Sequence, residues 1–141
     1  MPPTERKIKV CLPFIGDSIG GSYHSAIALI NALQKKNDVE VVVVLHLEES
    51  PLVDHLNQIG MKFILLPVKN FPGETASLFD ITSKLFQSGF ALANFLKKHE
   101  IDIVHTNDLR TNLAWSFACS WPLKSMFGTK DAFSRNLPFG I

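Results

Sequence analysis

Two adjacent glycines, Gly20 and Gly21, lie between an apolar run and a helical pattern, and this position predicts a site for an anion. A loop that leaves the carboxyl end of a strand and opens directly into a helix presents free backbone N–H groups at the positive end of the helix dipole. Because glycine has no side chain, a ligand can approach these groups closely. The pair therefore predicts a phosphate-binding turn, with a tight turn that only begins a helix as the alternative.

The elements that must position this turn follow from the apolar pattern. The runs Ile8–Phe14 and Val39–Leu45 are almost continuously apolar and rich in β-branched residues, which is typical of strands covered on both faces. Apolar residues recur at helical spacing over residues 22–35, so these three elements predict one βαβ unit. Further helices are expected at residues 51–59, 78–99 and 109–121, and further strands at residues 61–66 and 102–106.

This alternation of strands and helices predicts an α/β fold of the Rossmann-like type, with a doubly wound parallel sheet in three layers, α/β/α. Ligands of such sheets lie outside the carboxyl ends of the strands, near the point where the strand order reverses. Residues 16–24 follow the first strand and residues 105–110 follow the fourth. These two loops should therefore face each other at the ligand site.

Length and composition predict a single domain and exclude several functions. With 141 residues, 46% of them apolar and 19% charged, the chain can bury one ordinary core. A formal net charge of +1 provides no field for a polyanion, so nucleic acid is not an expected partner. The five histidines lack the spacing of metal ligands, so no metal is expected. Cys11 and Cys119 lie in apolar runs and are expected to be small buried hydrophobic residues.

The sequence carries no pattern for export or for membrane insertion. The charged N-terminus precedes only a strand's length of apolar residues, without a cleavage site of small residues. No apolar run is long enough to cross a bilayer. We therefore expect a soluble, cytoplasmic protein.

Four segments together match the pattern of one known family. They are IKVCLPF at Ile8–Phe14, GDSIGG at residues 16–21, LINAL at residues 29–33 and DIVHTND at residues 102–108. These segments resemble the N-terminal domain of a GT-B glycosyltransferase of the group 1, or family 4, type. The resemblance implies that residues 1–121 form a Rossmann-like glycosyltransferase N-terminal domain, a single half of a GT-B fold. Residues 122–141 are expected to hold a fifth strand and an irregular tail.

The resemblance also implies roles for individual residues, although no catalytic residue is identified. Gly20 and Gly21 would contact the diphosphate of a nucleotide-sugar, which is a substrate, so no separate cofactor is expected, and the transfer would be retaining. The residues expected to line the cleft or the acceptor site are Asp17, Ser22, Tyr23, His105, Asn107 and Asp108. Three of these have structural alternatives: Asp17 as a turn residue, His105 as a satisfied core histidine and Asp108 as a helix N-cap.

Enzymes of this family have a second, similar domain that carries most donor contacts, including a spaced pair of glutamates. Nothing after Trp121 is long enough to form that domain. We therefore expect an acceptor-side half that catalyses nothing measurable alone. Its expected partners are the missing C-terminal domain, a nucleotide-sugar and an unidentified acceptor.

The long helix expected at residues 78–99 carries more apolar surface than one core face needs. Phe79, Phe86 and Phe90 form a stripe beside its leucine face. One explanation is a broad face packed under neighbouring loops. The other is contact with the missing domain, self-association, or contact with a lipid-linked acceptor, which would place the protein at the inner face of a membrane.

Two other functional classes share parts of this pattern. An NAD(P)-binding short-chain dehydrogenase-like Rossmann domain would use Gly16 and Gly20, but Ser22 stands where that motif needs a third glycine. The Tyr-x-x-x-Lys pair of that class is also missing, because Ile27 follows Tyr23 at that offset. The second alternative is a non-enzymatic flavodoxin-like binding module, although the carboxylate cluster that receiver domains use is absent from the sequence.

Overall fold

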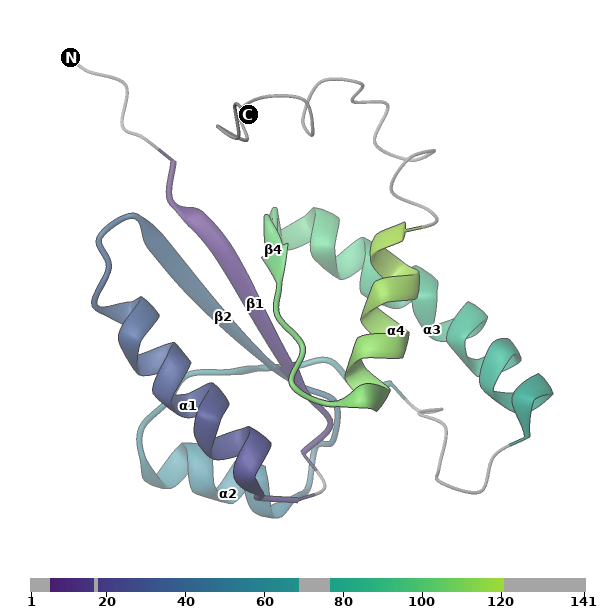
Figure 1. The fold of residues 1–141 in the computed structure, drawn as a ribbon, viewed down its shortest axis with the longest axis horizontal. Helices are drawn as coiled ribbons and strands as arrows, with labels where there is room; N and C mark the ends of the chain where they lie inside the picture. Colours follow the sequence, from purple (N-terminus) through teal and green to yellow (C-terminus); the bar gives the residue numbers. More distant parts are fainter. Residues whose placement is uncertain (1–5, 17, 69–76, 121–141) are drawn as a thin grey trace, which may run out of the picture.

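The computed structural model describes residues 6–16, 18–68 and 77–120. Strands and helices alternate along these residues, and the strands form a parallel sheet with the order β3-β2-β1-β4 (Figure 1). The strands are β1 (Ile8–Phe14), β2 (Val39–Leu45), β3 (Ile64–Leu65) and β4 (Ile103–Val104), and the helices are α1 (Gly21–Gln34), α2 (Pro51–Gln58), α3 (Leu78–His99) and α4 (Leu109–Ser120). This is the α/β fold that the sequence predicts.

The sheet contains the strand reversal that defines a ligand site in this class of fold. β1 and β2 pair in parallel up to their carboxyl ends, where Phe14 lies opposite Leu45. β4 joins the other edge of β1, with Cys11 opposite Val104. The chain therefore runs outward from β1 to β2 and β3 and then crosses to the opposite side for β4. The switch point lies between β1 and β4.

Helices cover both faces of the sheet: α1 and α2 lie on one side, and α3 and α4 lie on the other (Figure 1). Successive residues of β1 point to opposite faces, so this strand contributes to two cores. Leu12 packs in the core with Ile30 of α1 and Leu56 of α2. Cys11 packs in the other core with Trp115 of α4. Burial on both faces explains why β1 and β2 are almost continuously apolar.

Helices α2 and α3 begin at capping residues that are visible in the sequence. Ser50 accepts a hydrogen bond from the Val53 amide at 3.3 Å, and Pro51 follows at the first helical position of α2. Ser77 accepts from the Asp80 amide at 3.2 Å at the start of α3. The starts of both helices therefore coincide with serine residues that favour the N-cap position.

Strands β3 and β4 are shorter than the sequence predicts. The apolar pattern predicts strands over residues 61–66 and 102–106, whereas the paired residues are Ile64–Leu65 and Ile103–Val104. In the described part of the chain, each of these strands lies at an edge of the sheet and has one neighbouring strand. Single backbone hydrogen bonds continue past the paired residues, from the Leu66 amide to the Leu45 carbonyl and from the His105 amide to the Cys11 carbonyl.

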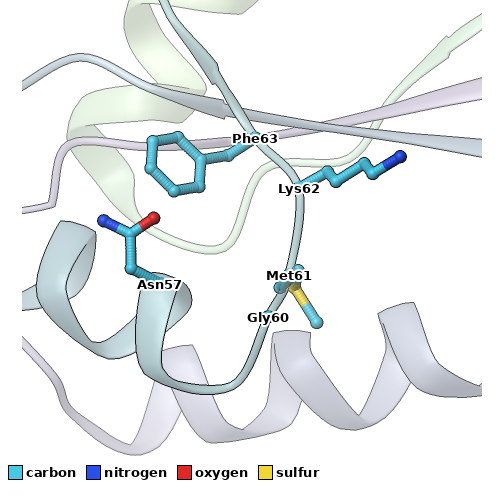
Figure 2. Close-up of a pocket in the computed structure, with 5 residues that line it drawn as sticks. All are labelled: Asn57, Gly60, Met61, Lys62 and Phe63. Atoms are coloured by element: carbon cyan, nitrogen blue, oxygen red, sulfur yellow. The ribbon is translucent and has the colours of Figure 1, made fainter.

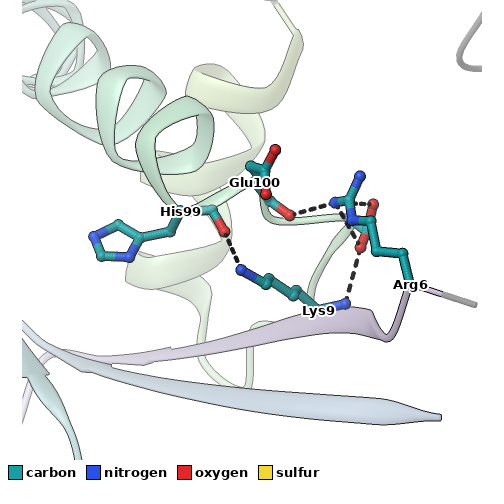
Figure 3. Close-up of polar contacts among 5 residues, drawn as sticks. Arg6, Lys9, His99 and Glu100 are labelled. Atoms are coloured by element: carbon teal, nitrogen blue, oxygen red, sulfur yellow. Dashed lines mark hydrogen bonds and ion pairs between the residues drawn. The ribbon is translucent and has the colours of Figure 1, made fainter. Parts of the chain in front are cut away.

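A set of polar contacts ties the start of β1 to the end of α3 and the start of β4 (Figure 3). The Arg6 guanidinium donates to the Glu100 carbonyl at 2.8 Å and pairs with the Asp102 carboxylate at 3.1 Å. Asp102 also accepts from the Lys9 amide at 2.9 Å, and the Lys9 ammonium donates to the His99 carbonyl at 3.2 Å. These contacts lie at the amino edge of the sheet, so they support the fold rather than the glycine turn at the other edge.

Candidate functional site

The candidate site lies at the carboxyl edge of the sheet, where β1 leads into α1 and β4 leads towards α4 (Figure 1). β1 and β4 are neighbours, and just beyond β4 the His105 amide donates to the Cys11 carbonyl at 2.9 Å. The glycine turn and the loop after β4 therefore leave the sheet from adjacent strands at the same edge.

Gly16 directs the chain away from β1. It is buried and has a φ of 97°, a conformation that residues with side chains rarely adopt. A Cβ atom at this position would lie 3.1 Å from Oγ of Ser50, at the start of α2. The turn therefore requires glycine here for its backbone and for its space.

The amino end of α1 has no side-chain cap. Gly20 is the N-cap residue in an extended conformation, and the first helical turn contains no acidic residue. The His24 amide donates the first helical hydrogen bond, to the Gly20 carbonyl at 3.2 Å. The amides of Gly21, Ser22 and Tyr23 therefore have no acceptor within the helix. A Cβ at Gly20 or Gly21 would meet nothing within 4 Å, so this open helix end fits an anionic group.

Tyr23 lies in the first turn of α1, but its ring belongs to the core. The residue is 3% exposed, and its ring packs edge-on against Phe14 and His55, with centroid distances of 6.0 Å and 5.6 Å. Its hydroxyl is buried without a hydrogen-bond partner among the described residues. Burial raises the pKa of Tyr23, so the hydroxyl is protonated and able to donate at neutral pH.

The predicted cleft residues after β4 differ in their surroundings. His105 is exposed and is therefore not a core histidine. Nδ2 of Asn107 is buried without a partner in the described structure. Asp108 caps α4, because its carboxylate accepts from the Thr111 amide at 2.9 Å and from the Thr111 hydroxyl at 3.0 Å. The N-cap alternative for Asp108 is thus confirmed.

His46 was not identified from the sequence, although it lies at the same edge of the sheet. It directly follows β2 and is 2% exposed. Its Nδ1 lies 2.9 Å from the Leu66 carbonyl, and its Nε2 accepts from the Trp115 indole at 3.0 Å. Burial lowers the pKa of His46, and the Leu66 carbonyl and the Asp108 carboxylate partly oppose this shift. The sequence signal that could have identified His46 is its position as a polar residue directly after a buried strand.

Two cavities lie away from the glycine turn. One of about 470 Å³ lies beside the turn from α2 to β3 and is lined by Asn57, Gly60, Met61, Lys62 and Phe63 (Figure 2). In Figure 2 the Lys62 side chain points away from Asn57, so polar groups do not converge there. The other, of about 230 Å³, lies between β4 and α4 and is lined by Val104, Thr106, Asn112, Trp115, Ser116 and Cys119. Neither cavity includes Gly20 or Gly21.

The remaining predicted features are partly covered by the described residues. Asp17 and residues 122–141 lie outside them, as does the side chain of Phe86. Phe79 and Phe90 of α3 are 83% and 51% exposed. Within the described residues, no helix is both long and apolar enough to cross a membrane, and no three His, Cys, Asp or Glu side chains are grouped to hold a metal.

Comparisons with known proteins support the fold. No protein-family model matches the sequence, and no curated protein matches it. The solved structure of a UDP-N-acetylglucosamine 2-epimerase is similar, with a TM-score of 0.57 and 25% identity, over 81% of this chain and 30% of that chain. The structure of Acinetobacter baumannii MurG is also similar, with a TM-score of 0.55 and 14% identity, over 80% of this chain and 32% of that chain.

This chain therefore spans about a third of the length of these two structures. Both neighbours have the GT-B fold, and neither distinguishes the group 1, or family 4, type from other types. The described residues have the Rossmann-like α/β fold that matches one part of a GT-B protein.

Proposed function

We propose that the chain is the N-terminal, acceptor-side domain of a GT-B glycosyltransferase that uses a nucleotide-sugar donor. The observation that carries this proposal is the open, uncapped amino end of α1 at the switch point of the sheet. Ligands of doubly wound sheets bind at that point, and helix amino ends favour phosphate groups. MurG is a glycosyltransferase with this fold, and the proposal extends that reaction class to this chain. The family 4 type rests on the sequence resemblance alone.

In this proposal the main chain of the glycine turn acts on the leaving group. The amides of Gly21 and Ser22 would donate to the diphosphate and stabilise the charge that builds on it during transfer. Asn107 Nδ2 and the Tyr23 hydroxyl would find partners in the ligand or in water held beside it. Such partners matter, because a buried polar group without one costs about 1–3 kcal/mol. A second domain would complete the donor site.

A second candidate is one domain of a nucleotide-sugar epimerase. The UDP-N-acetylglucosamine 2-epimerase shares 25% identity with this chain, against 14% for MurG. Both candidates place a nucleotide diphosphate at the glycine turn. They differ in the need for an acceptor: an epimerase would convert the nucleotide-sugar alone, whereas a transferase releases the nucleotide when an acceptor is present.

Ligand binding to the 141-residue chain tests the anion site directly. The ligands are UDP-, GDP- and ADP-sugars and NAD, with thermal unfolding and calorimetric titration as the measurements. We expect weak stabilisation by at least one nucleotide-sugar, because the chain supplies only part of the binding site, and no stabilisation by NAD. Binding of NAD alone would favour the dehydrogenase-like alternative, and no binding of any nucleotide would favour the binding module.

Variants of Gly20 separate the anion site from the fold. Gly20 is exposed and extended, so it accepts a side chain without strain. In Gly20→Asp, the carboxylate would cap α1 and raise Tm slightly, yet it would repel a diphosphate. Gly20→Asn is the matched control, because it caps the helix without a charge. We expect nucleotide-sugar binding to be lost in Gly20→Asp and to weaken less in Gly20→Asn, because the neutral amide competes for the first-turn amides but does not repel the diphosphate. Equal binding by both variants and the wild type would exclude the glycine turn as the phosphate site.

A further inference from the structure

Both nitrogens of the His46 ring are engaged inside the protein, and their partners define its protonation state. The ring is 2% exposed. Its Nδ1 lies 2.9 Å from the Leu66 carbonyl oxygen, which can only accept a hydrogen bond. Its Nε2 lies 3.0 Å from Nε1 of Trp115, which can only donate. The ring is therefore neutral, with its proton on Nδ1 and a lone pair on Nε2.

Through these bonds His46 joins the central sheet to α4. Its own amide donates to the Phe14 carbonyl at 3.1 Å, at the carboxyl end of β1. Trp115 and Thr111 of α4 are both 0% exposed and lie one helical turn apart, so both face the protein interior. Thr111 in turn bonds to the capping carboxylate of Asp108. His46 therefore helps to position α4. The first turn of α4, through its bonds to Asp108, positions the loop after β4.

We propose that His46 is a positioning residue and a proton-operated latch for the candidate site. In its neutral form it holds α4 and, with it, Asn107 and Asp108 at the carboxyl edge of the sheet. A proton added at Nε2 would turn this acceptor into a donor that faces the Trp115 N–H. That hydrogen bond would be lost and two N–H groups would oppose each other, so α4 would move from its place. The effect on ligand binding rests on the proposed function, whereas the latch itself does not.

The surroundings of the ring favour the neutral form near pH 7. Burial lowers the pKa of His46 from its ordinary value of 6.5, because a charged ring would be withdrawn from water. The Leu66 carbonyl and the Asp108 carboxylate act in the opposite direction, but burial is the larger cause. The described groups around the His46 ring include the Leu66 carbonyl after β3, the Trp115 indole from α4 and the Asp108 carboxylate before α4. The Phe14 carbonyl of β1 accepts from the His46 backbone amide.

The direction of the pH effect follows from this lowered pKa. The unfolded chain takes up the proton on His46 at a higher pH than the folded chain does. Stability linked to His46 is therefore complete above about pH 6.5 and is lost as the pH falls below that value. The latch should open in the same direction, on the acid side of neutrality.

A titration of the ligand-free, isotope-labelled 141-residue chain by NMR tests the latch. As the pH falls from 8 over the range in which the chain stays folded, we expect His46 to titrate with a midpoint below its ordinary 6.5. The indole N–H of Trp115 and the amide of Thr111 should shift with that same midpoint. A His46 midpoint at or above 6.5 would overturn the proposal.

Two variants test the proposal independently, so one result remains if the other variant folds poorly. His46→Gln can donate to Leu66 and accept from Trp115 but does not titrate, so the shifts of the Trp115 indole N–H and the Thr111 amide should disappear. Trp115→Phe removes the indole donor, so the His46 midpoint should rise towards its ordinary value. Shifts in His46→Gln that match the wild type would overturn the latch.

A control variant and a ligand titration complete the test. His99→Gln removes a histidine at the amino edge of the sheet and should leave the Trp115 indole and Thr111 amide shifts unchanged. Nucleotide-sugar binding should weaken as the pH falls from 7.5 through the His46 midpoint in the wild type, and less in His46→Gln. If the shifts follow His46 but no nucleotide-sugar binds at any pH, the latch stands and the proposed function fails.

Discussion

Gly16 and Gly20 both belong to the turn after β1, but their backbones have different requirements. Gly16 is buried with a φ of 97° and lies against Ser50, so it builds the turn. Gly20 has a φ of −130° and open space around it, so its backbone would tolerate other residues. The fold would therefore accept a side chain at position 20, and glycine leaves that space open. This contrast is the reason to look for a ligand at Gly20 and not at Gly16.

Gly16→Ala should destabilise the protein. A left-handed backbone costs a residue with a side chain about 1–2 kcal/mol, and here the new Cβ also meets Ser50 Oγ at 3.1 Å. Gly60→Ala is a suitable control, because Gly60 has a φ of 68° and nothing within 4 Å. Urea unfolding should show a larger loss for Gly16→Ala than for Gly60→Ala. Equal losses would contradict a role for the Ser50 contact.

Asp108 can be tested as a cap and as a ligand contact separately. Asp108→Ala removes the acceptor of the Thr111 amide and should lower the free energy of unfolding by about 1 kcal/mol. Asp108→Asn keeps an oxygen acceptor and should lose less stability. If Asp108→Asn also binds nucleotide-sugar like the wild type, the residue acts only as a cap. Equal stability losses in the two variants would contradict the capping role.

At the scale of the elements, local signals could be read from the sequence and long-range packing could not. The bounds of β1 and β2 follow from nearly continuous apolar runs, and serine caps mark the starts of α2 and α3. The bond between His46 and Trp115 joins residues 69 positions apart, so no local pattern contains it. The short pairing of β3 and β4 likewise depends on the neighbours of these strands.

The burial of Tyr23 had a local signal that the motif-based interpretation did not use. Tyr23, Ala26 and Ile30 are the buried residues of α1, and their spacing is that of one helical face. The resemblance to GT-B glycosyltransferases implies a cleft-lining role for Tyr23. Its ring lies in the core instead, and only its hydroxyl, which has no partner among the described residues, keeps it a candidate for ligand contact.

Gly89 lies where α3 packs against α4, and its contact with Phe117 predicts the effect of adding a side chain there. A Cβ at this position would lie 3.0 Å from Cδ1 of Phe117. In a helix, Gly→Ala normally stabilises by about 0.5–1 kcal/mol, but here the new methyl group would press on the Phe117 ring. We expect Gly89→Ala to be neutral or destabilising in the wild type. In a Phe117→Leu background the same change should stabilise, as measured by a double-mutant cycle of urea unfolding. A stabilising effect in both backgrounds would contradict this prediction, because it would show that the Phe117 ring can move aside without a cost in stability.

At the scale of the whole molecule, weak charge and exposed apolar residues favour association. The formal net charge is +1, so electrostatic repulsion between copies is small. Leu78 and Phe79 at the start of α3 are 84% and 83% exposed, and Phe90 further along the helix is 51% exposed. Neighbouring exposed residues of this size mark contact surfaces more often than single ones do. The first turn of α3 is therefore the part of this helix on which to test for a partner.

Phe79→Ser should reduce association of the chain with itself or with lipid. The change removes the apolar ring from solvent without adding charge, so fold stability should hardly change, because an 83% exposed side chain contributes little to the core. Sedimentation velocity over a range of concentrations measures self-association, and co-sedimentation with anionic vesicles measures lipid contact. Ile59→Ser is the control, since Ile59 is 47% exposed at the end of α2 on the other face of the sheet. A wild-type chain that stays monomeric and leaves vesicles unbound, or an equal effect of both variants, would remove α3 as a contact surface.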